Sequence, residues 1–303
     1  MKLFEDKEKF EEYLSKTSEF FQIDKTQIEK DYFVVLVLKR AFQFVPGLVF
    51  KGGTSLSKCQ KVIHRFSEDI DLTLDLSHSS QKFKRESLRI LIQICDEEPF
   101  SLANKDVRAK HTHANYNMFD IKYPNSELNP GIRENIKMEM VYLSKCYPSE
   151  KSMICSYIGE YLSAINRVDL IQEFELEPFE IQVQSLIRTL VDKVFAICDY
   201  YLRNEVQRNS RHIYDICQIL TKVELNDNLK ELIHEVRVER QKSDRCPSSI
   251  EGVSINKILS EIISSNFYKR DYENVTRLLL FKDFEYEDAI KSLDAIIKSN
   301  IFE

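Results

Sequence analysis

The hydrophobic pattern of the chain changes near residue 184, and this change constrains the fold more than any other feature of the sequence. Before it, helical segments alternate with short strand-like segments rich in β-branched and aromatic residues, at 48–53, 69–76, 119–123, 136–143 and 179–185. After it, every segment has helical periodicity and strand patterns are absent. We therefore expect an α+β fold, with a mixed sheet flanked by helices over residues 1–183 and a helical bundle over 184–303.

Composition indicates a folded protein without membrane or metal-cysteine sites. The 303 residues include 43 Lys+Arg and 49 Asp+Glu, for a net charge of −6. The longest apolar run, Phe33–Leu38, is far shorter than the roughly 20 residues of a membrane span, and no secretory signal is visible. Seven scattered cysteines without a CxxC pair indicate reduced thiols, and His111 and His113 fit a polar loop better than a metal site. We expect a cytoplasmic protein, monomeric by default, with no membrane partner.

The segment KGGTSLSKCQKVIHRFSEDIDLTLD, residues 51–75, separates its charges along the chain. Its first fifteen residues hold four Lys or Arg side chains and no acid, whereas the next ten hold four acids. In a strand, Asp69 and Asp71 project from one face while Ile70 and Leu72 project into the core. Two adjacent carboxylates repel each other unless a cation lies between them, so a pair of Mg²⁺ ions, or Mn²⁺ in their place, is expected here. The alternative is an exposed strand face that carries two acids by chance.

A third acid lies on the strand predicted for 136–143. Glu139 shares one face of that strand with Lys137, while Met138 and Met140 share the other. Glu139 would complete a three-carboxylate site for two metal ions. The alternative is a surface ion pair between Lys137 and Glu139.

The glycine pair Gly52-Gly53 follows a predicted strand and precedes a predicted helix, for which Thr54 is the expected N-cap. Glycines at such a turn let the backbone approach a phosphate, and the Thr54 hydroxyl adds a donor. The segment matches neither a Walker A loop nor a Rossmann fingerprint. An ordinary strand-to-helix turn is the alternative.

With these motifs the chain resembles the AbiEii/AbiGii-type toxin family of the nucleotidyltransferase superfamily, which is related in fold to DNA polymerase β. The resemblance is carried by these stretches: IEKDYFVVLVLK (28–39), KGGTSLSK (51–58), RFSEDIDLTLD (65–75), IKMEMVYL (136–143), TLVDKVFAI (189–197) and SRHIYDI (210–216). It implies that Asp69, Asp71 and Glu139 are the catalytic, metal-binding acids. The nucleotide- or phosphate-binding residues that we predict are Gly52, Gly53, Thr54, Lys58, Lys193, Arg211 and Asp215.

The residues of the helical half permit plainer interpretations when taken alone. Lys193 adjoins Asp192, which is typical of a solvated charge pair. Arg211 and Asp215 are four apart on one helix, the spacing of a simple salt bridge, with His212 as its neighbour.

The resemblance implies transfer of a nucleoside monophosphate from an NTP to an acceptor hydroxyl, with release of pyrophosphate. It also implies an RNA acceptor, such as a tRNA 3′ end, and the toxin role in a toxin–antitoxin or abortive-infection pair with a cognate antitoxin. The alternatives are a non-catalytic nucleotide- or RNA-binding regulator and an enzyme that transfers a nucleotide or phosphate to a protein. The net charge of −6 does not exclude nucleic acid, because the cations of 51–65 predict a local basic cleft.

Overall fold

The computed structural model describes the chain except for residues 1, 77–79, 105, 107–115, 126–131 and 144–147. His111, His113 and Cys146 lie outside the described residues. The chain divides into two compact units, one formed by residues 1–60 and 67–184 and the other by residues 61–66 and 185–303. The architecture is of the α+β class, as the sequence predicts. The prediction from the sequence divides the chain at 183/184 and does not include residues 61–66 in the helical unit.

The described part of the first unit contains a seven-stranded mixed sheet with the order β3-β4-β5-β2-β1-β7-β6. Its strands are β1 (Leu48–Lys51), β2 (Ile70–Asp75), β3 (Ser101–Leu102), β4 (Tyr116–Lys122), β5 (Ile136–Leu143), β6 (Ser149–Ile154) and β7 (Phe179–Gln184). In the centre, β2 runs antiparallel to β1 and parallel to β5. The parallel pairing of β2 and β5 brings the two acid-bearing strands side by side.

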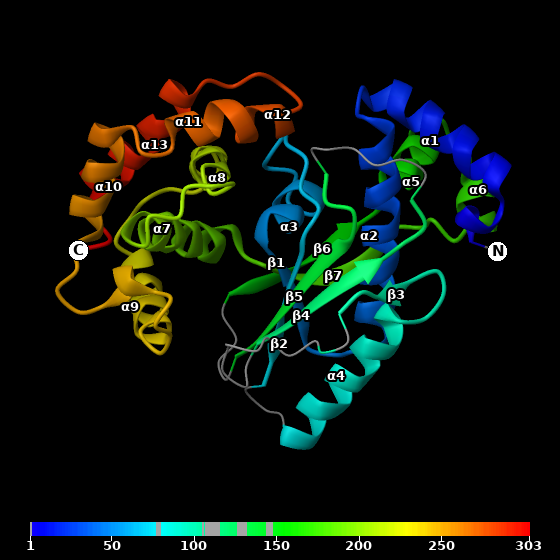
Figure 1. Ribbon diagram of the computed structural model, residues 1–303, viewed down its shortest axis with the longest axis horizontal. Helices are drawn as coiled ribbons and strands as arrows, with labels where there is room; N and C mark the ends of the chain where they lie inside the picture. The colour runs from blue at the N-terminus through cyan, green and yellow to red at the C-terminus, as the bar shows by residue number, and fades with distance from the viewer. Residues whose placement is uncertain (1, 77–79, 105, 107–115, 126–131, 144–147) are drawn as a thin grey trace. The chain divides into compact units, whose positions relative to one another are not determined.

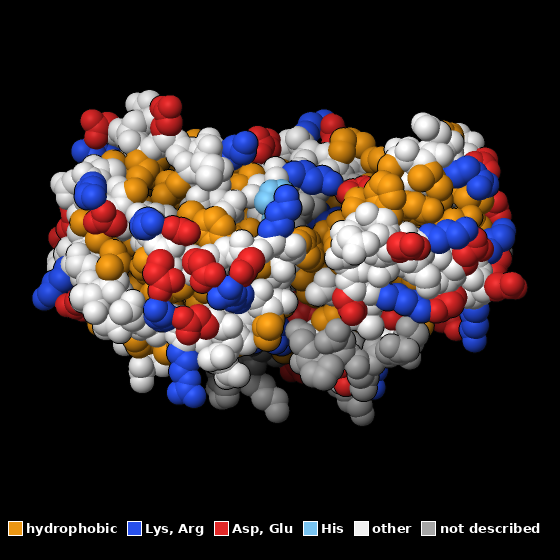
Figure 2. Space-filling model, turned by 90° about the horizontal axis from the view of Figure 1, so that it is seen from above, with side chains coloured by type: hydrophobic (Ala, Val, Ile, Leu, Met, Phe, Trp, Pro, Cys, Tyr) orange, Lys and Arg blue, Asp and Glu red, His pale blue; other side chains and the backbone are white. Residues whose placement is uncertain are grey.

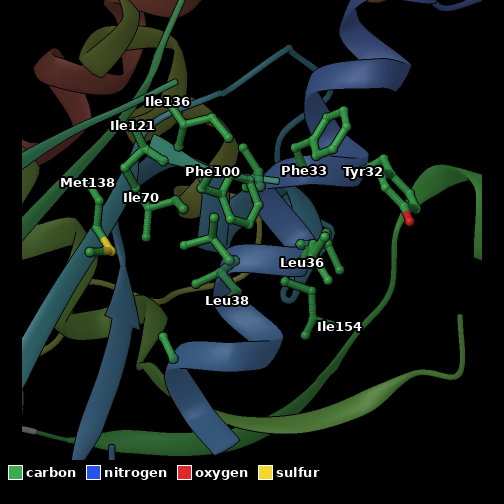
Figure 3. Close-up of a cluster of buried hydrophobic side chains, with 14 of the residues drawn as sticks. Tyr32, Phe33, Leu36, Leu38, Ile70, Phe100, Ile121, Ile136, Met138 and Ile154 are labelled. Carbon is green, nitrogen blue, oxygen red and sulfur yellow. The ribbon is translucent and has the colours of Figure 1, made fainter. Parts of the chain in front are cut away.

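Helices cover the apolar face of this sheet. They are α1 (Lys7–Phe21), α2 (Lys25–Phe44), α4 (Gln81–Cys95), α5 (Tyr157–Ala164) and α6 (Val168–Glu173), with α1, α5 and α6 gathered beside α2 (Figure 1). Asp24 caps α2 by accepting a hydrogen bond from the Thr26 amide. The side chains of Phe33 and Leu38 on α2 then pack toward Ile70 and Met138 of the sheet (Figure 3). Burial of these apolar side chains leaves the opposite face of β2 and β5 for polar residues.

Three details of the first unit differ from the sequence predictions. The helix after β1, α3, spans Gly52–Lys58 and not 54–63, and its N-cap is Lys51 in extended conformation. The prediction of Thr54 as N-cap is therefore wrong, because the left-handed Gly52 already turns the chain into the helix. Strands β3 and β6 were not predicted, since β3 has two residues and β6 (SEKSMI) lies at the sheet edge and is largely polar.

The second unit is helical. Its longer helices are α7 (Leu186–Leu202), α8 (Arg211–Leu220), α9 (Leu229–Arg240), α10 (Ile255–Ser265) and α13 (Tyr286–Ser299). Shorter helical segments lie between these helices: Pro247–Ser249, α11 (Lys269–Asp271), the π-helical Tyr272–Thr276 and α12 (Arg277–Leu279). Helix α7 is central, in contact with α8, α9 and α10, and Ser185 caps it by accepting from the Arg188 amide.

The segment 61–66 pairs with the chain just after α12. The Phe66 amide donates to the Leu279 carbonyl at 2.8 Å, and the Phe281 amide donates to the His64 carbonyl at 2.9 Å. These bonds flank an antiparallel bridge between Arg65 and Leu280. Residues next to the glycine-rich turn in sequence are therefore part of the helical unit.

The surface carries both signs of charge. Lys/Arg and Asp/Glu side chains are interspersed, with apolar side chains between them, on the face drawn in Figure 2. Among the described residues, no helix has the length and hydrophobicity needed to cross a bilayer.

Candidate functional site

The turn at Gly52 is built against the carboxylate of Asp71. Gly52 has φ = +80°, a conformation that residues with a side chain rarely adopt. A Cβ atom at this position would lie 2.0 Å from Oδ2 and 2.9 Å from Cγ of Asp71. Only glycine therefore lets the turn and this carboxylate occupy adjacent space. Gly53 follows in the first turn of α3.

The acids predicted on β2 and β5 lie on the polar face of adjacent strands. Asp71 is the register partner of Glu139 across the parallel β2–β5 pair, and of Lys51 across the β1–β2 pair. Side chains of the alternating residues Ile70, Leu72, Met138 and Met140 are fully buried on the other face. Asp69 immediately precedes β2 and is 9% exposed. The strand pattern thus brings the three predicted acids to one region of one sheet, as expected from the period of two.

Glu139 and Asp69 have basic or hydroxyl neighbours. The Lys137 ammonium lies 2.9 Å from Glu139 Oε2, and the Tyr116 hydroxyl donates to Glu139 Oε1. The ion pair between Lys137 and Glu139 that the sequence offered as an alternative is therefore present. Arg133 Nε lies 3.6 Å from Asp69 Oδ1. Cations thus offset part of the repulsion between the acids.

The chemistry of the three carboxylates suits a hard divalent cation. Mg²⁺ and Mn²⁺ prefer oxygen ligands, and the glycine at position 52 leaves the Asp71 carboxylate space that a Cβ would fill. Within the described ranges, however, no group of three or more His, Cys, Asp or Glu side chains has the spacing of a formed metal site. The donor set fits the expected ion by ligand type, and binding would require the carboxylates to adjust.

The side chains of Thr54 and Lys58 are engaged inside the protein. Thr54 is buried, and its hydroxyl donates to the Asp69 carbonyl at 2.6 Å. Lys58 is 3% exposed, with its ammonium 2.8 Å from Asp31 Oδ1 and 3.7 Å from the centre of the Tyr157 ring. Thr54 thereby fixes the backbone that carries Asp69, and Lys58 joins α3 to α2. Their assignment as phosphate ligands stays a prediction.

The sequence did not reveal a buried ion pair beside the acids, between Lys30 and Glu68. The structure buries the Lys30 side chain of α2 completely, with Nζ 2.9 Å from Glu68 Oε2. Burial lowers the pKa of Lys30, and the negative charge of Glu68 opposes this shift. The signals in the sequence are that Glu68 directly precedes Asp69 and that Lys30 and Glu68 both lie in stretches that carry the family resemblance, 28–39 and 65–75.

A second charged cluster lies within the helical unit. Arg65 Nε and Nη2 donate to the two carboxylate oxygens of Asp215 at 2.7 and 2.8 Å, and Lys193 Nζ donates to Asp215 Oδ2 at 2.6 Å. All three side chains are at least nine-tenths buried. Lys193 is therefore not the solvated partner of Asp192, which instead pairs with Arg188 at 3.0 Å. This cluster brings together two of the residues predicted to bind nucleotide, Lys193 and Asp215.

Two of the four Lys and Arg side chains in the basic stretch 51–65 do not contribute to the local basic cleft that its composition predicts. Lys58 and Arg65 are both buried and paired with acids, Asp31 and Asp215. Sequence counting could not show this, because the two acids lie far along the chain from their partners. The cleft prediction fails for these two cations.

Arg211 and His212 lie at the start of α8, beside this cluster in sequence. Arg211 is half-buried, and His212 stacks on Tyr200 with ring centres 5.6 Å apart. Desolvation, with the positive charges of Lys193 and Arg211, holds the pKa of His212 well below its usual range. His212 is therefore neutral at pH 7, which does not favour a role as a phosphate-binding cation.

The Asp215 cluster leads to a prediction about stability and pH. Burial alone would raise the pKa of Asp215, but Arg65 and Lys193 outweigh burial and hold it well below the usual range. A carboxylate whose pKa is depressed in the folded state stabilises the fold at pH values above its pKa in the unfolded chain. This contribution is lost as the pH falls through the folded-state pKa.

Replacing Asp215 with Asn should destabilise the protein by about 3 kcal/mol at pH 7, since it leaves two buried cations without their acid. Denaturant unfolding of Asp215→Asn and wild type from pH 7 to pH 2 should show the difference shrinking below about pH 4. Asp227→Asn, on an exposed acid of the same unit, is the control. A difference that stays constant over this pH range would contradict the assignment.

Comparison with known proteins identifies one family. The family profile described as "Nucleotidyl transferase AbiEii toxin, Type IV TA system" matches residues 36–298. No curated protein matches the sequence of the chain. Among solved structures, the crystal structure of JHP933 from Helicobacter pylori is similar at 15% sequence identity and a TM-score of 0.45, covering 91% of this chain and 92% of that one.

Proposed function

Because the chain belongs to the AbiEii family of nucleotidyltransferase toxins, we propose that it transfers a nucleoside monophosphate from an NTP to an acceptor hydroxyl of RNA in a Mg²⁺-dependent reaction. A tRNA 3′ end is the acceptor that we expect. The observation that carries the proposal is the register pairing of Asp71 with Glu139, with the Gly52 turn packed against Asp71 and Asp69 two residues away.

In the proposed step, an acceptor hydroxyl oxygen attacks the α-phosphorus of the NTP. A new P–O bond forms, the bond to the β-phosphate oxygen breaks, and pyrophosphate leaves. The hydroxyl proton passes to a carboxylate, for which Glu139 is the candidate. The Tyr116 hydroxyl and the Lys137 ammonium hold the Glu139 carboxylate in one orientation for this transfer.

Asp69, Asp71 and Glu139 would hold the metal ions. When bound, Mg²⁺ supplies positive charge to the phosphate chain and to the leaving pyrophosphate. Two features of the protein would support metal binding. The Thr54 hydroxyl donates to the Asp69 carbonyl and so fixes the backbone of Asp69, and Gly52 leaves space beside the Asp71 carboxylate. Preorganised charge of this kind is commonly the largest contribution to such catalysis.

The toxin role and a cognate antitoxin are supported by the family description, which names a type IV toxin–antitoxin system. The nucleotide contacts expected of Lys193, Arg211 and Asp215 stay predictions. In the present structure Lys193 and Asp215 bond to each other in the helical unit. Release of either for substrate would require this bond to open.

The proposal predicts a metal-dependent transfer. Purified protein is incubated with total RNA and each α-³²P-labelled NTP in turn, and the products are separated on a denaturing gel. We expect label on a discrete RNA species in Mg²⁺, loss of that label in EDTA, and recovery when excess Mg²⁺ is restored. Label that is unaffected by EDTA would contradict metal dependence. Label on protein instead of RNA would contradict the proposed acceptor.

A further inference from the structure

A short segment before β5, residues 132–135 and here called the strap, is fastened by the buried pair Lys30–Glu68. The Lys30 ammonium donates to the Asn135 carbonyl at 2.9 Å and also to the Arg133 carbonyl. The Arg133 amide in turn donates to Glu68 Oε2 at 3.0 Å, the same oxygen that accepts from Lys30 at 2.9 Å. The buried ion pair therefore holds the strap backbone in two ways. The Lys30 ammonium binds two of its carbonyl oxygens, and the Glu68 carboxylate binds one of its amides.

The strap presents the side chain of Arg133 to the acids. Its Nε lies 3.6 Å from Asp69 Oδ1, and the side chain is 41% exposed. A guanidinium has five N–H donors, so the long contact between Arg133 Nε and Asp69 leaves other donors for a ligand. Arg133 is therefore a cation held at the acids and accessible to solvent.

Thr54 and Lys58, the two side-chain donors predicted to bind phosphate in the first unit, are less accessible than Arg133. The Thr54 hydroxyl is used by the Asp69 carbonyl, and the Lys58 ammonium is buried against Asp31. Lys137 is closer to its acid than Arg133 is, at 2.9 Å from Glu139, and is less exposed at 28%. Phosphate recognition favours a guanidinium, whose planar fork pairs with two phosphate oxygens.

We propose that Arg133 binds the phosphate chain of the NTP in the first unit, and that Lys30 and Glu68 are positioning residues that hold it there through the strap. The inference rests on the proposed function, because it assumes that an NTP binds at the three acids. It adds a phosphate ligand and its support, neither of which the motifs indicate.

The first test concerns Arg133 and uses binding without turnover. Affinities of the full chain for the four α,β-methylene NTP analogues are measured by calorimetry with Mg²⁺ at fixed salt. We expect Arg133→Gln to weaken binding of the preferred analogue roughly 10- to 100-fold, and Arg133→Lys to weaken it less, because one charge-assisted interaction is lost or reduced. Arg89→Gln, on an exposed arginine of the same unit, should bind as wild type does. In turnover, the KM for NTP should rise more than kcat falls. Wild-type affinity in Arg133→Gln would overturn the proposal; because this residue is partly exposed, the variant is expected to fold.

The second test concerns the buried pair. Replacing both members by apolar residues in Lys30→Met/Glu68→Leu removes the strap anchors without leaving a buried charge, so the variant should fold. We expect its analogue binding to be weakened about as much as in Arg133→Gln. Adding Arg133→Gln to this background should have a much smaller effect than in wild type, because the two changes act through the same contact. A folded double variant with wild-type affinity would overturn the positioning role. If the double variant does not fold, Lys30→Met/Glu68→Gln replaces it. This variant keeps an acceptor for the Arg133 amide and leaves no buried charge, but it removes the ammonium that holds both strap carbonyls, so weakened binding is expected and wild-type affinity would again overturn the positioning role.

Analogue binding by Arg133→Gln and nucleotide transfer by wild type together distinguish failure of this inference from failure of the proposed function. If wild type transfers nucleotide and Arg133→Gln binds the analogues equally well, the phosphate assignment fails and the function stands. If Arg133→Gln loses affinity but no wild-type transfer product is found with any NTP, the assignment stands and the function fails.

Discussion

Replacing Asp71 with Asn is expected to reduce nucleotidyl transfer by roughly 10³-fold or more, while the protein remains folded. Asn has nearly the same shape as Asp, so the contact with the Gly52 turn is kept, but the negative charge needed to hold a divalent cation is lost. The Asp71 carboxylate lies against the Gly52 turn, and Glu139 is opposite Asp71 in register. The rate is measured with saturating NTP and labelled RNA, and folding is checked by thermal unfolding.

Asp75→Asn provides a matched control, because Asp75 is an acid at the other end of the same strand. It should retain transfer within about twofold, as expected for a surface substitution away from the site. Equal losses in the two variants would indicate a general effect of charge on the strand. Full activity in Asp71→Asn would remove Asp71 from the mechanism.

Replacing Gly52 with Ala is expected to cause the second largest loss, about 100-fold in transfer with unfolding stability lowered by roughly 1–2 kcal/mol. The stability change arises from a left-handed φ of +80°, which Ala tolerates poorly. The activity change arises because the new Cβ would lie 2.0 Å from Asp71 Oδ2, so the carboxylate must move.

Gly252→Ala separates these two causes. Gly252 has nearly the same backbone angle, φ = +81°, but no atom lies within 4 Å of a Cβ built there. This control should lose similar stability and keep its transfer activity. Loss of activity in both variants, or in neither, would contradict a specific role for the Gly52–Asp71 contact.

The parts of the fold that depend on local pattern were predictable. Strand β5 has the predicted bounds 136–143, because Ile136, Met138 and Met140 alternate with polar residues. Strand β6 was not predicted because its sequence is largely polar and it lies at the edge of the sheet that the described residues form. The start of α3 was misplaced because a conventional N-cap residue, Thr54, follows the glycine that makes the turn.

Charges with distant partners were not predictable. Lys30 and Glu68 are 38 residues apart, and Arg65 and Asp215 are 150 apart, so nothing local indicates that these side chains are buried together. The sequence indicates which residue types are present, whereas pairing depends on which elements the fold brings into contact. Strand periodicity was enough to propose the acids Asp69, Asp71 and Glu139. The strap could not be proposed, because it depends on the contact between Lys30 and Glu68.

The measurement that tests the central claim most directly follows two labels in parallel. Wild-type protein, Mg²⁺ and RNA are incubated with the preferred NTP labelled with ³²P at either the α- or the γ-phosphate, and both RNA and released pyrophosphate are quantified. The account predicts α-label on RNA, γ-label only in pyrophosphate, one pyrophosphate for each nucleotide transferred, and neither product with Asp71→Asn. Label from the γ-phosphate on RNA or protein would show a phosphotransferase instead, and bound NTP with no product from either label would show a binding protein.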